Sequence, residues 1–70
     1  MTIGLKNVRK RRGLSIEALS IRTGVNKSSL KKYESGERDI KKASYETLEL
    51  LSSFLNVPIE ALVREEEDLF

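Results

Sequence analysis

Residues 13–36, with the sequence GLSIEALSIRTGVNKSSLKKYESG, constrain the fold of this chain more than any other segment. Two short helical patterns lie there on either side of a Gly24-Val25-Asn26 corner, and the second pattern opens with a cluster of lysines and serines. A corner of this kind fixes two helices nearly at right angles. The second helix can then project from the body of the protein into a groove of a partner.

Length and composition limit what surrounds this corner. A chain of 70 residues makes one domain, and at this size only about 60% of the unfolded surface can be buried, so the core must be simple. Cysteine and histidine are absent, which excludes disulfides and thiolate metal sites and removes the commonest general base. Lysines and carboxylates form no arrangement of nucleophile and base. We therefore predict no cofactor, no metal site and no enzymatic activity.

Other classes are disfavoured on similar grounds. Tryptophan is absent and aromatic residues make up 6% of the chain, which disfavours a stacking surface for single-stranded nucleic acid. No apolar run approaches the roughly 20 residues that span a bilayer, and the N-terminus lacks the apolar centre of a secretory signal. A cytoplasmic protein is expected.

The helical patterns predict an all-α domain of five helices. The expected helices are about 2–12 with Thr2 as N-cap, 15–24 with Ser15 as N-cap, 26–36 with Asn26 as N-cap, 44–56, which starts near Ser44, and 58–63. Residues 37–43 are expected to form a loop that Ile40 anchors. The domain is expected to cover residues 1–64, followed by an acidic tail, 65–70, that is frayed by repulsion between its carboxylates.

The core of this domain should be aliphatic. One set of leucine, valine and isoleucine residues falls on the inner faces of the expected helices: Leu5, Val8, Leu19, Val25, Leu30, Leu48, Leu51, Leu55, Val57, Ile59 and Leu62. Tyr33 is expected to point inward with Leu30.

Charge is divided strongly along the chain. Residues 1–42 hold twelve basic and four acidic groups, a net charge of +8, whereas residues 43–70 hold one basic and seven acidic groups, a net charge of −6. Like charges concentrated in one half repel one another unless a partner neutralises them, and a polyanion is the usual partner. The alternative is a solvated basic face without a ligand.

The order of motifs resembles the Cro and lambda-repressor-like family of helix-turn-helix regulators, also called the xenobiotic-response-element family. The similarity covers residues 5–63 and includes the basic first helix ending in Gly, Leu-Ser before the second helix, Leu19 with Gly24, and Tyr33-Glu34-x-Gly36. It continues through Thr47-Leu48 and Phe54-Leu55-x-Val57. The resemblance implies a five-helix lambda-repressor-like fold and a transcriptional regulator that binds DNA.

The resemblance also implies structural roles. Gly24 occupies the turn, where positive φ is required. Ser20 stands where the family usually has Ala, and its hydroxyl is expected to bond back to a helix carbonyl. Arg9 and Glu34 match positions that form an ion pair between the first and third helices; the alternative is two independent surface charges.

In this family the third helix, here about residues 27–35, enters the major groove. The implied base contacts are Lys27, Ser28, Ser29, Lys31 and Lys32, of which Lys27 and Ser28 are the strongest candidates and the last two lysines could be only solvated. The implied contacts to the DNA backbone are Ser15, Ile16, Asn26, Arg11, Arg12, Lys41 and Lys42. Arg38 and Asp39 are expected to pair with each other.

Two departures from the family pattern bear on DNA contacts. Ile16 stands where the family often has Gln, which bridges a phosphate and the recognition helix; an isoleucine could instead touch a thymine methyl group or a sugar. The loop after Gly36 is also longer than the common form, so its usual contacts are not carried over.

The same resemblance indicates which partners the protein binds. Family members bind two-fold operators as dimers, so we expect double-stranded DNA with a palindromic operator and a weak homodimer. The apolar residues left after the core is filled are Ile21, Ile40, Leu50, Val63, Leu69 and Phe70.

The leading hypothesis is a repressor of phage or mobile-element type. The alternative is an antitoxin-type module whose acidic half neutralises a protein partner. The Glu65–Asp68 run lacks the spacing of a calcium loop, which favours a solvated tail.

Overall fold

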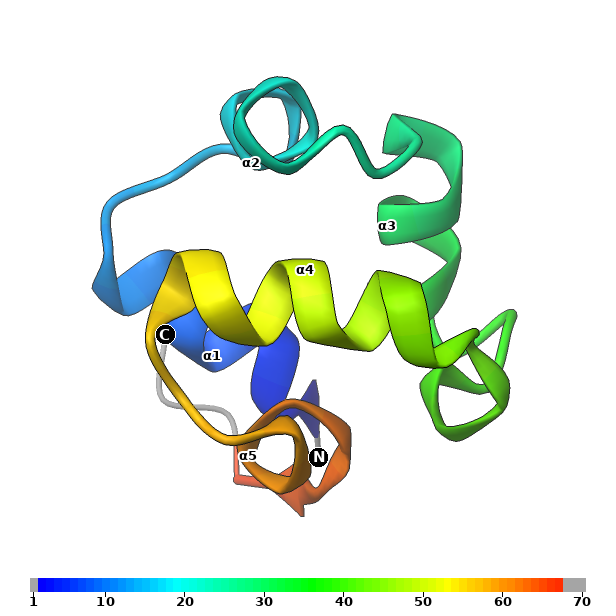
Figure 1. Cartoon of the computed structure of the whole chain (residues 1–70). Helices are drawn as coiled ribbons and strands as arrows, with labels where there is room; N and C mark the ends of the chain where they lie inside the picture. Colours follow the sequence, from blue (N-terminus) through cyan, green and yellow to red (C-terminus); the bar gives the residue numbers. More distant parts are fainter. Residues whose placement is uncertain (1, 68–70) are drawn as a thin grey trace.

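A computed structural model describes residues 2–67 of the chain, and these residues form five α-helices (Figure 1). In chain order the elements are β1 (Thr2–Ile3), α1 (Gly4–Arg11), α2 (Ile16–Thr23), α3 (Lys27–Ser35), the 3-10 helix η1 (Ile40–Lys42), α4 (Tyr45–Leu55), α5 (Ile59–Val63) and β2 (Glu65–Glu66). Helix α4 crosses the middle of the molecule, with α2 on one side of it and α5 on the other. The all-α prediction with five helices is confirmed.

Side-chain caps set most helix boundaries, at Ser15 and Asn26 as predicted and at Ser44, where the sequence predicted a helix start without a cap. Ser15 Oγ accepts a hydrogen bond from the Ala18 amide at 3.0 Å, and Ser44 Oγ accepts one from the Thr47 amide at 3.2 Å. Asn26 Oδ1 accepts from the amide of Ser28 at 2.8 Å. Each bond satisfies an amide that the first turn of a helix leaves without an intrahelical partner, so the local sequence fixes where these helices begin.

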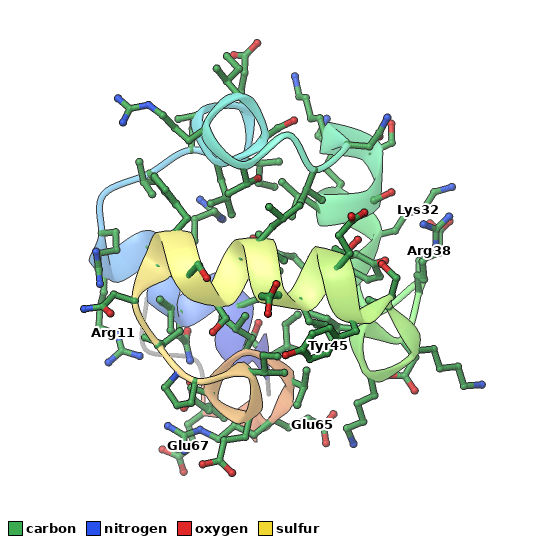
Figure 2. The ribbon with its side chains drawn as sticks, in the orientation of Figure 1. Arg11, Lys32, Arg38, Tyr45, Glu65 and Glu67 are labelled. Carbon is green, nitrogen blue, oxygen red and sulfur yellow. The ribbon has the colours of Figure 1, made fainter. Side chains whose placement is uncertain are left out.

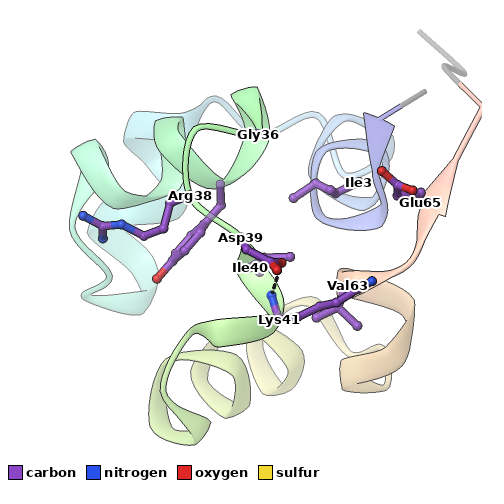
Figure 3. A pocket seen from close by; sticks show the side chains of 9 residues that line it. Ile3, Gly36, Arg38, Asp39, Ile40, Lys41, Val63 and Glu65 are labelled. Atoms are coloured by element: carbon purple, nitrogen blue, oxygen red, sulfur yellow. Dashed lines mark hydrogen bonds between the residues drawn. The ribbon is translucent and has the colours of Figure 1, made fainter.

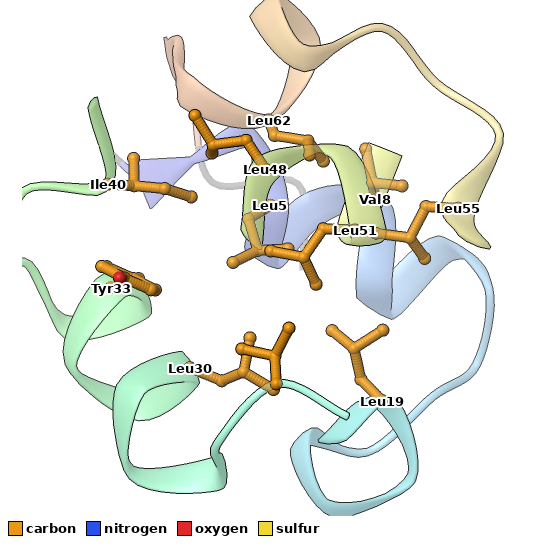
Figure 4. Packing of buried hydrophobic residues seen from close by; sticks show 11 residues of the cluster. Leu5, Val8, Leu19, Leu30, Tyr33, Ile40, Leu48, Leu51, Leu55 and Leu62 are labelled. Carbon is orange, nitrogen blue, oxygen red and sulfur yellow. The ribbon is translucent and has the colours of Figure 1, made fainter. Parts of the chain in front are cut away.

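The core lies between α4 and the surrounding helices (Figure 4). Leu5, Leu19, Leu30, Leu51, Leu55 and Leu62 are fully buried, as predicted, and Tyr33 joins them. Val57 and Ile59 are only half-buried and pack at the margin of the core, since Val57 lies in the short connection into α5 and Ile59 is the first residue of α5. Ile40, predicted as a loop anchor and counted among the leftover apolar residues, is 2% exposed and belongs to the core.

The two ends of the described chain pair with each other, which the sequence analysis did not predict. Strands β1 and β2 are antiparallel, with Thr2 opposite Glu66 and Ile3 opposite Glu65. The expected Thr2 cap is therefore wrong: Ile3 precedes α1 without a capping side chain. Fraying from residue 65 is also wrong for Glu65 and Glu66, because backbone pairing and the buried Asn7 hold them. Asn7 also donates to the Glu67 carbonyl at 3.2 Å, and the last three residues of the expected tail, 68–70, lie outside the described residues.

The segment after α3 contains a short helix instead of the expected loop. Asp39 caps η1, since its carboxylate accepts from the Lys41 amide at 3.0 Å. The three residues of η1 place Ile40 against the core. Sequence periodicity could not show this element, because a single turn of three residues is too short for a pattern to repeat.

Candidate nucleic-acid interface

The corner between α2 and α3 is held by hydroxyl groups. Ser20 Oγ donates to the Val25 carbonyl at 2.6 Å, and Thr23 Oγ1 donates to the Leu19 carbonyl and accepts from the Val25 amide. The predicted hydrogen bond from Ser20 to a carbonyl of its own helix is wrong, because the hydroxyl donates to the Val25 carbonyl of the turn instead. Gly24 has φ +80°, as the turn requires. Two side chains of α2 thus fix the angle at which α3 leaves.

A buried ion pair holds the other end of α3. Arg9 Nε and Nη2 donate to the two carboxylate oxygens of Glu34 at 2.7 and 2.9 Å, and Arg9 Nη1 donates to the Leu14 carbonyl at 2.6 Å. The two side chains are 9% and 6% exposed. One guanidinium therefore joins α1, α3 and the segment before α2, and α3 is fixed at both ends.

The exposed face of α3 carries most of the residues expected to contact bases. Lys27, Ser28 and Lys31 are exposed, and Lys32 projects at the edge of the molecule (Figure 2). Its ammonium lies 3.9 Å from a Glu37 carboxylate oxygen, in an exposed pair. Ser29 is half-buried at the flank of the helix. Three of the five residues expected to contact bases, Lys27, Ser28 and Lys31, thus lie on the exposed face of α3. The other two, Ser29 and Lys32, lie beside this face.

Five of the residues expected to hold phosphates lie at the starts of α2 and α3 and on η1. Ser15 and Asn26 are exposed at the starts of α2 and α3, and each already caps its own helix. Ile16 is half-buried against the core, which leaves only part of it for DNA. Lys41 and Lys42 are exposed on η1, where Lys41 extends beside Val63 (Figure 3).

Arg11 and Arg12 lie apart from α3. Arg12 Nη2 donates to the Leu55 carbonyl at the end of α4. Both arginines line a shallow cavity of about 300 Å³ between α1 and α5, together with Arg64. Figure 2 places Arg11 and Lys32 near opposite ends of α4. The geometry does not bring these two arginines to the face that carries Lys27 and Lys31.

Arg38 makes a contact with α3 that the sequence pattern did not predict. Its guanidinium lies 5.8 Å from the centroid of the Tyr33 ring, and Nη1 donates to Ser29 Oγ at 3.2 Å. Asp39 caps η1, and the Arg38 side chain turns back to α3 instead of pairing with Asp39. The only sequence feature that indicates this contact is a cationic residue five positions after an inward-pointing tyrosine, and that feature is weak.

Further site classes find no support within residues 2–67. These residues contain no cluster of acidic side chains placed to bind a metal ion. Among the same residues, every helix is too short or too polar to cross a membrane.

The order and geometry of these helices agree with known proteins. A sequence model described as helix-turn-helix matches residues 5–62. The chain belongs to the Cro and lambda-repressor-like family of helix-turn-helix regulators. A search of curated proteins finds no match.

Two solved structures of a helix-turn-helix relative resemble this chain over nearly its whole length. One is the N-terminal DNA binding domain of SinR from Bacillus subtilis, with 31% identity, a TM-score of 0.77, and coverage of 91% of this chain and 90% of that one. The other is the solution structure of the N-terminal DNA-binding domain of the master biofilm-regulator SinR from Bacillus subtilis, with 32% identity, a TM-score of 0.66, and coverage of 97% and 99%. The resemblance stated from the sequence is thereby confirmed.

Proposed function

We propose that this chain is a sequence-specific DNA-binding transcriptional regulator that acts as a repressor in the cytoplasm and places α3 in the major groove. The observation that carries the proposal is the exposed face of α3, where Lys27, Ser28 and Lys31 stand on a helix fixed at both ends. An occupied operator would block transcription without any chemical step by the protein.

The side chains on this face suit direct readout of bases. Lysine donates to O6 and N7 of guanine, and serine donates to or accepts from several base edges. Lys27 and Ser28, in the first turn of α3, are the proposed principal base contacts. Lys31 and Lys32 lie about one turn further, where a base edge and a phosphate are both within reach of a long side chain.

Backbone contacts would fix the register of α3 in the groove. The starts of α2 and α3 present amide groups and a partial positive charge, which favour a phosphate. Ser15, Asn26 and the lysines of η1 supply further donors around the helix. The position of Arg11 and Arg12 beside α5 argues for a different role for them.

A palindromic operator bound by two copies is the form of recognition proposed here. Leu50 is 44% exposed on α4 and Ile21 is 75% exposed on α2, so apolar surface remains outside the core. A small apolar contact would give a weak homodimer that forms chiefly on DNA, where the two half-sites hold the copies together.

Titration against a genomic fragment library at several salt concentrations tests the proposed function. We expect a few fragments to bind far more tightly than bulk fragments, with affinity falling as salt rises because phosphate contacts release counterions. Uniform binding of all fragments would contradict sequence-specific regulation.

An antitoxin-type role is the second candidate, because α4 presents an acidic and apolar face. Tyr45 is 69% exposed and stands beside the exposed Glu46 and Glu49 on the same side of the helix. A basic protein partner would cover such a surface. Co-purification from the native cell with one stoichiometric basic partner, lost in a Tyr45→Ala, Glu49→Lys variant, would favour this role.

A further inference from the structure

Arg38 is seated on the flank of α3 by two side chains of that helix. The guanidinium lies over the Tyr33 ring, 5.8 Å from its centroid, and Ser29 Oγ accepts a hydrogen bond from Nη1 at 3.2 Å. A cation over an aromatic face is attracted by the negative face of the ring. The side chain is therefore preorganised although it is exposed.

The backbone before Arg38 is fixed as well. Gly36 ends α3 with φ +86°, the Glu37 amide donates to Ser35 Oγ at 3.3 Å, and the Arg38 amide donates to the Lys32 carbonyl at 3.1 Å. These bonds turn the chain back along α3. Figure 2 accordingly shows Arg38 next to Lys32, on the same side of the molecule.

Most of the guanidinium remains available. Of its five N–H donors, only Nη1 takes part in a hydrogen bond among residues 2–67. The acidic neighbours are engaged elsewhere, Asp39 as the cap of η1 and Glu37 beside Lys32. A guanidinium seated on α3 close to a lysine, with donors that make no hydrogen bond among residues 2–67, is suited to a phosphate group.

We propose that Arg38 contacts a phosphate of the DNA backbone at the edge of the groove that α3 enters, and that Ser29 and Tyr33 are positioning residues for it. This inference rests on the proposed function, because it takes the face of α3 as the side that meets DNA. It assigns Ser29 a supporting role in place of the base contact expected from the sequence.

The test compares Arg38→Ala with the wild-type chain on a labelled random-sequence duplex pool and on the duplex that wild type enriches from it. Losing one phosphate contact should weaken binding to both DNAs, roughly five- to tenfold near 0.1 M salt, and reduce the slope of log K against log salt by about one. Arg64→Ala is the matched control, because it removes the same charge from the end of the molecule formed by α5 and β2. It should leave the slope unchanged.

Two further variants separate the effect of positioning Arg38 by Ser29 and Tyr33 from the effect of its charge alone. Arg38→Lys keeps the positive charge but lacks the planar guanidinium, which can donate two hydrogen bonds to one phosphate and lie over the Tyr33 ring. Its affinity for DNA should therefore lie between those of Arg38→Ala and the wild type. Ser29→Ala should weaken both DNAs equally, by roughly two- to threefold, with the same enriched sequence, since one hydrogen bond is lost. Thermal melting of each variant confirms folding.

The results distinguish the inference from the function on which it rests. An Arg38→Ala chain with unchanged affinity and salt slope overturns the phosphate contact, while enrichment of a sequence by wild type would leave the proposed function standing. A loss confined to the enriched duplex also overturns it, in favour of a base contact. If wild type enriches no sequence, the proposed function fails.

Discussion

At the scale of single residues, the Arg9–Glu34 pair fixes the end of α3. Both side chains are nearly buried, and three hydrogen bonds satisfy the guanidinium. A buried charge left without its partner is costly, since neither water nor a counter-charge replaces the lost interaction. The pair therefore makes α3 and α1 depend on each other.

Replacing Glu34 by Ala should destabilise the protein by roughly 3 kcal/mol, because Arg9 keeps a charge in a buried site. Thermal unfolding measures the loss as a lower melting temperature. Glu37→Ala is the matched control, since its carboxylate is exposed and only 3.9 Å from one lysine, and it should change stability by less than about 1 kcal/mol. Equal melting temperatures for the two variants would refute the role of the pair.

Lys27→Ala should change which sequences the protein prefers, in addition to lowering affinity. Lys27 is exposed in the first turn of α3, where a side chain reaches base edges. Enrichment from a random duplex pool compares the preferred sequences of the variant and the wild type. A uniform loss of affinity, with the same preferred sequence, would make Lys27 a phosphate contact.

Residue-level signals were reliable where the physics is local. Ser15 and Asn26 each accept a hydrogen bond from an amide two or three positions ahead, so the sequence alone was sufficient to predict these caps. Thr2 has the same capping chemistry but lies in a strand, because residues more than sixty positions away pair with it. The stacking of Arg38 on Tyr33 depends on how Gly36 turns the chain, which composition does not encode.

At the scale of elements, α1 and α5 are packed so closely that one position has no room for a side chain. A Cβ added at Gly4 would lie 1.8 Å from the Ala61 carbonyl oxygen. The Gly4 amide also donates to the Arg64 carbonyl at 2.8 Å. The start of α1 is therefore placed by contact with α5 and β2, which explains why its first residue could not be read from the sequence.

Gly4→Ala should destabilise the protein by about 3 kcal/mol, because backbone atoms would have to move apart. Gly13→Ala is the comparison: its φ is +69° but a Cβ would meet no atom within 4 Å, so only the conformational cost of about 1 kcal/mol is expected. Chemical denaturation measures both. A smaller loss at Gly4 than at Gly13 would contradict the close contact.

At the scale of the whole molecule, the charge division along the chain corresponds to different parts of the fold. Lys27, Lys31 and Lys32 lie on α3, whereas Glu65 and Glu67 lie at the end formed by α5 and β2 (Figure 2). The sequence alone shows that basic and acidic residues are concentrated in different halves of the chain. Where these charges lie on the surface depends on the fold. The basic groups of α1 are an exception, since Arg11 and Arg12 lie near α5.

The carboxylate that joins the two ends of the described chain gives stability a dependence on pH. Asn7 donates to Glu66 at 2.9 Å and Arg64 does so at 2.9 Å, and these bonds lower the pKa of Glu66 below its usual 4.5. A lowered folded-state pKa means that the contribution is present above the unfolded value and is lost as pH falls through the folded one. We expect the melting-temperature difference between wild type and Glu66→Gln to shrink below pH 4.5.

Glu49→Gln, on the exposed face of α4, is the matched substitution for that comparison. Its effect should depend less on pH than that of Glu66→Gln. A difference for Glu66→Gln that stays constant across the acidic range would show that the hydrogen bonds from Asn7 and Arg64 do not favour the ionised carboxylate.

Dimethyl sulfate footprinting of the enriched duplex tests most directly whether α3 reads DNA in the major groove. The reagent methylates guanine N7 in the major groove and adenine N3 in the minor groove. The account predicts that the wild-type chain protects guanine N7 within a short segment, that adenine N3 there stays reactive, and that Lys27→Ala loses protection at particular guanines. Reactive guanine N7 throughout the bound duplex, or protection unchanged by Lys27→Ala, would contradict it.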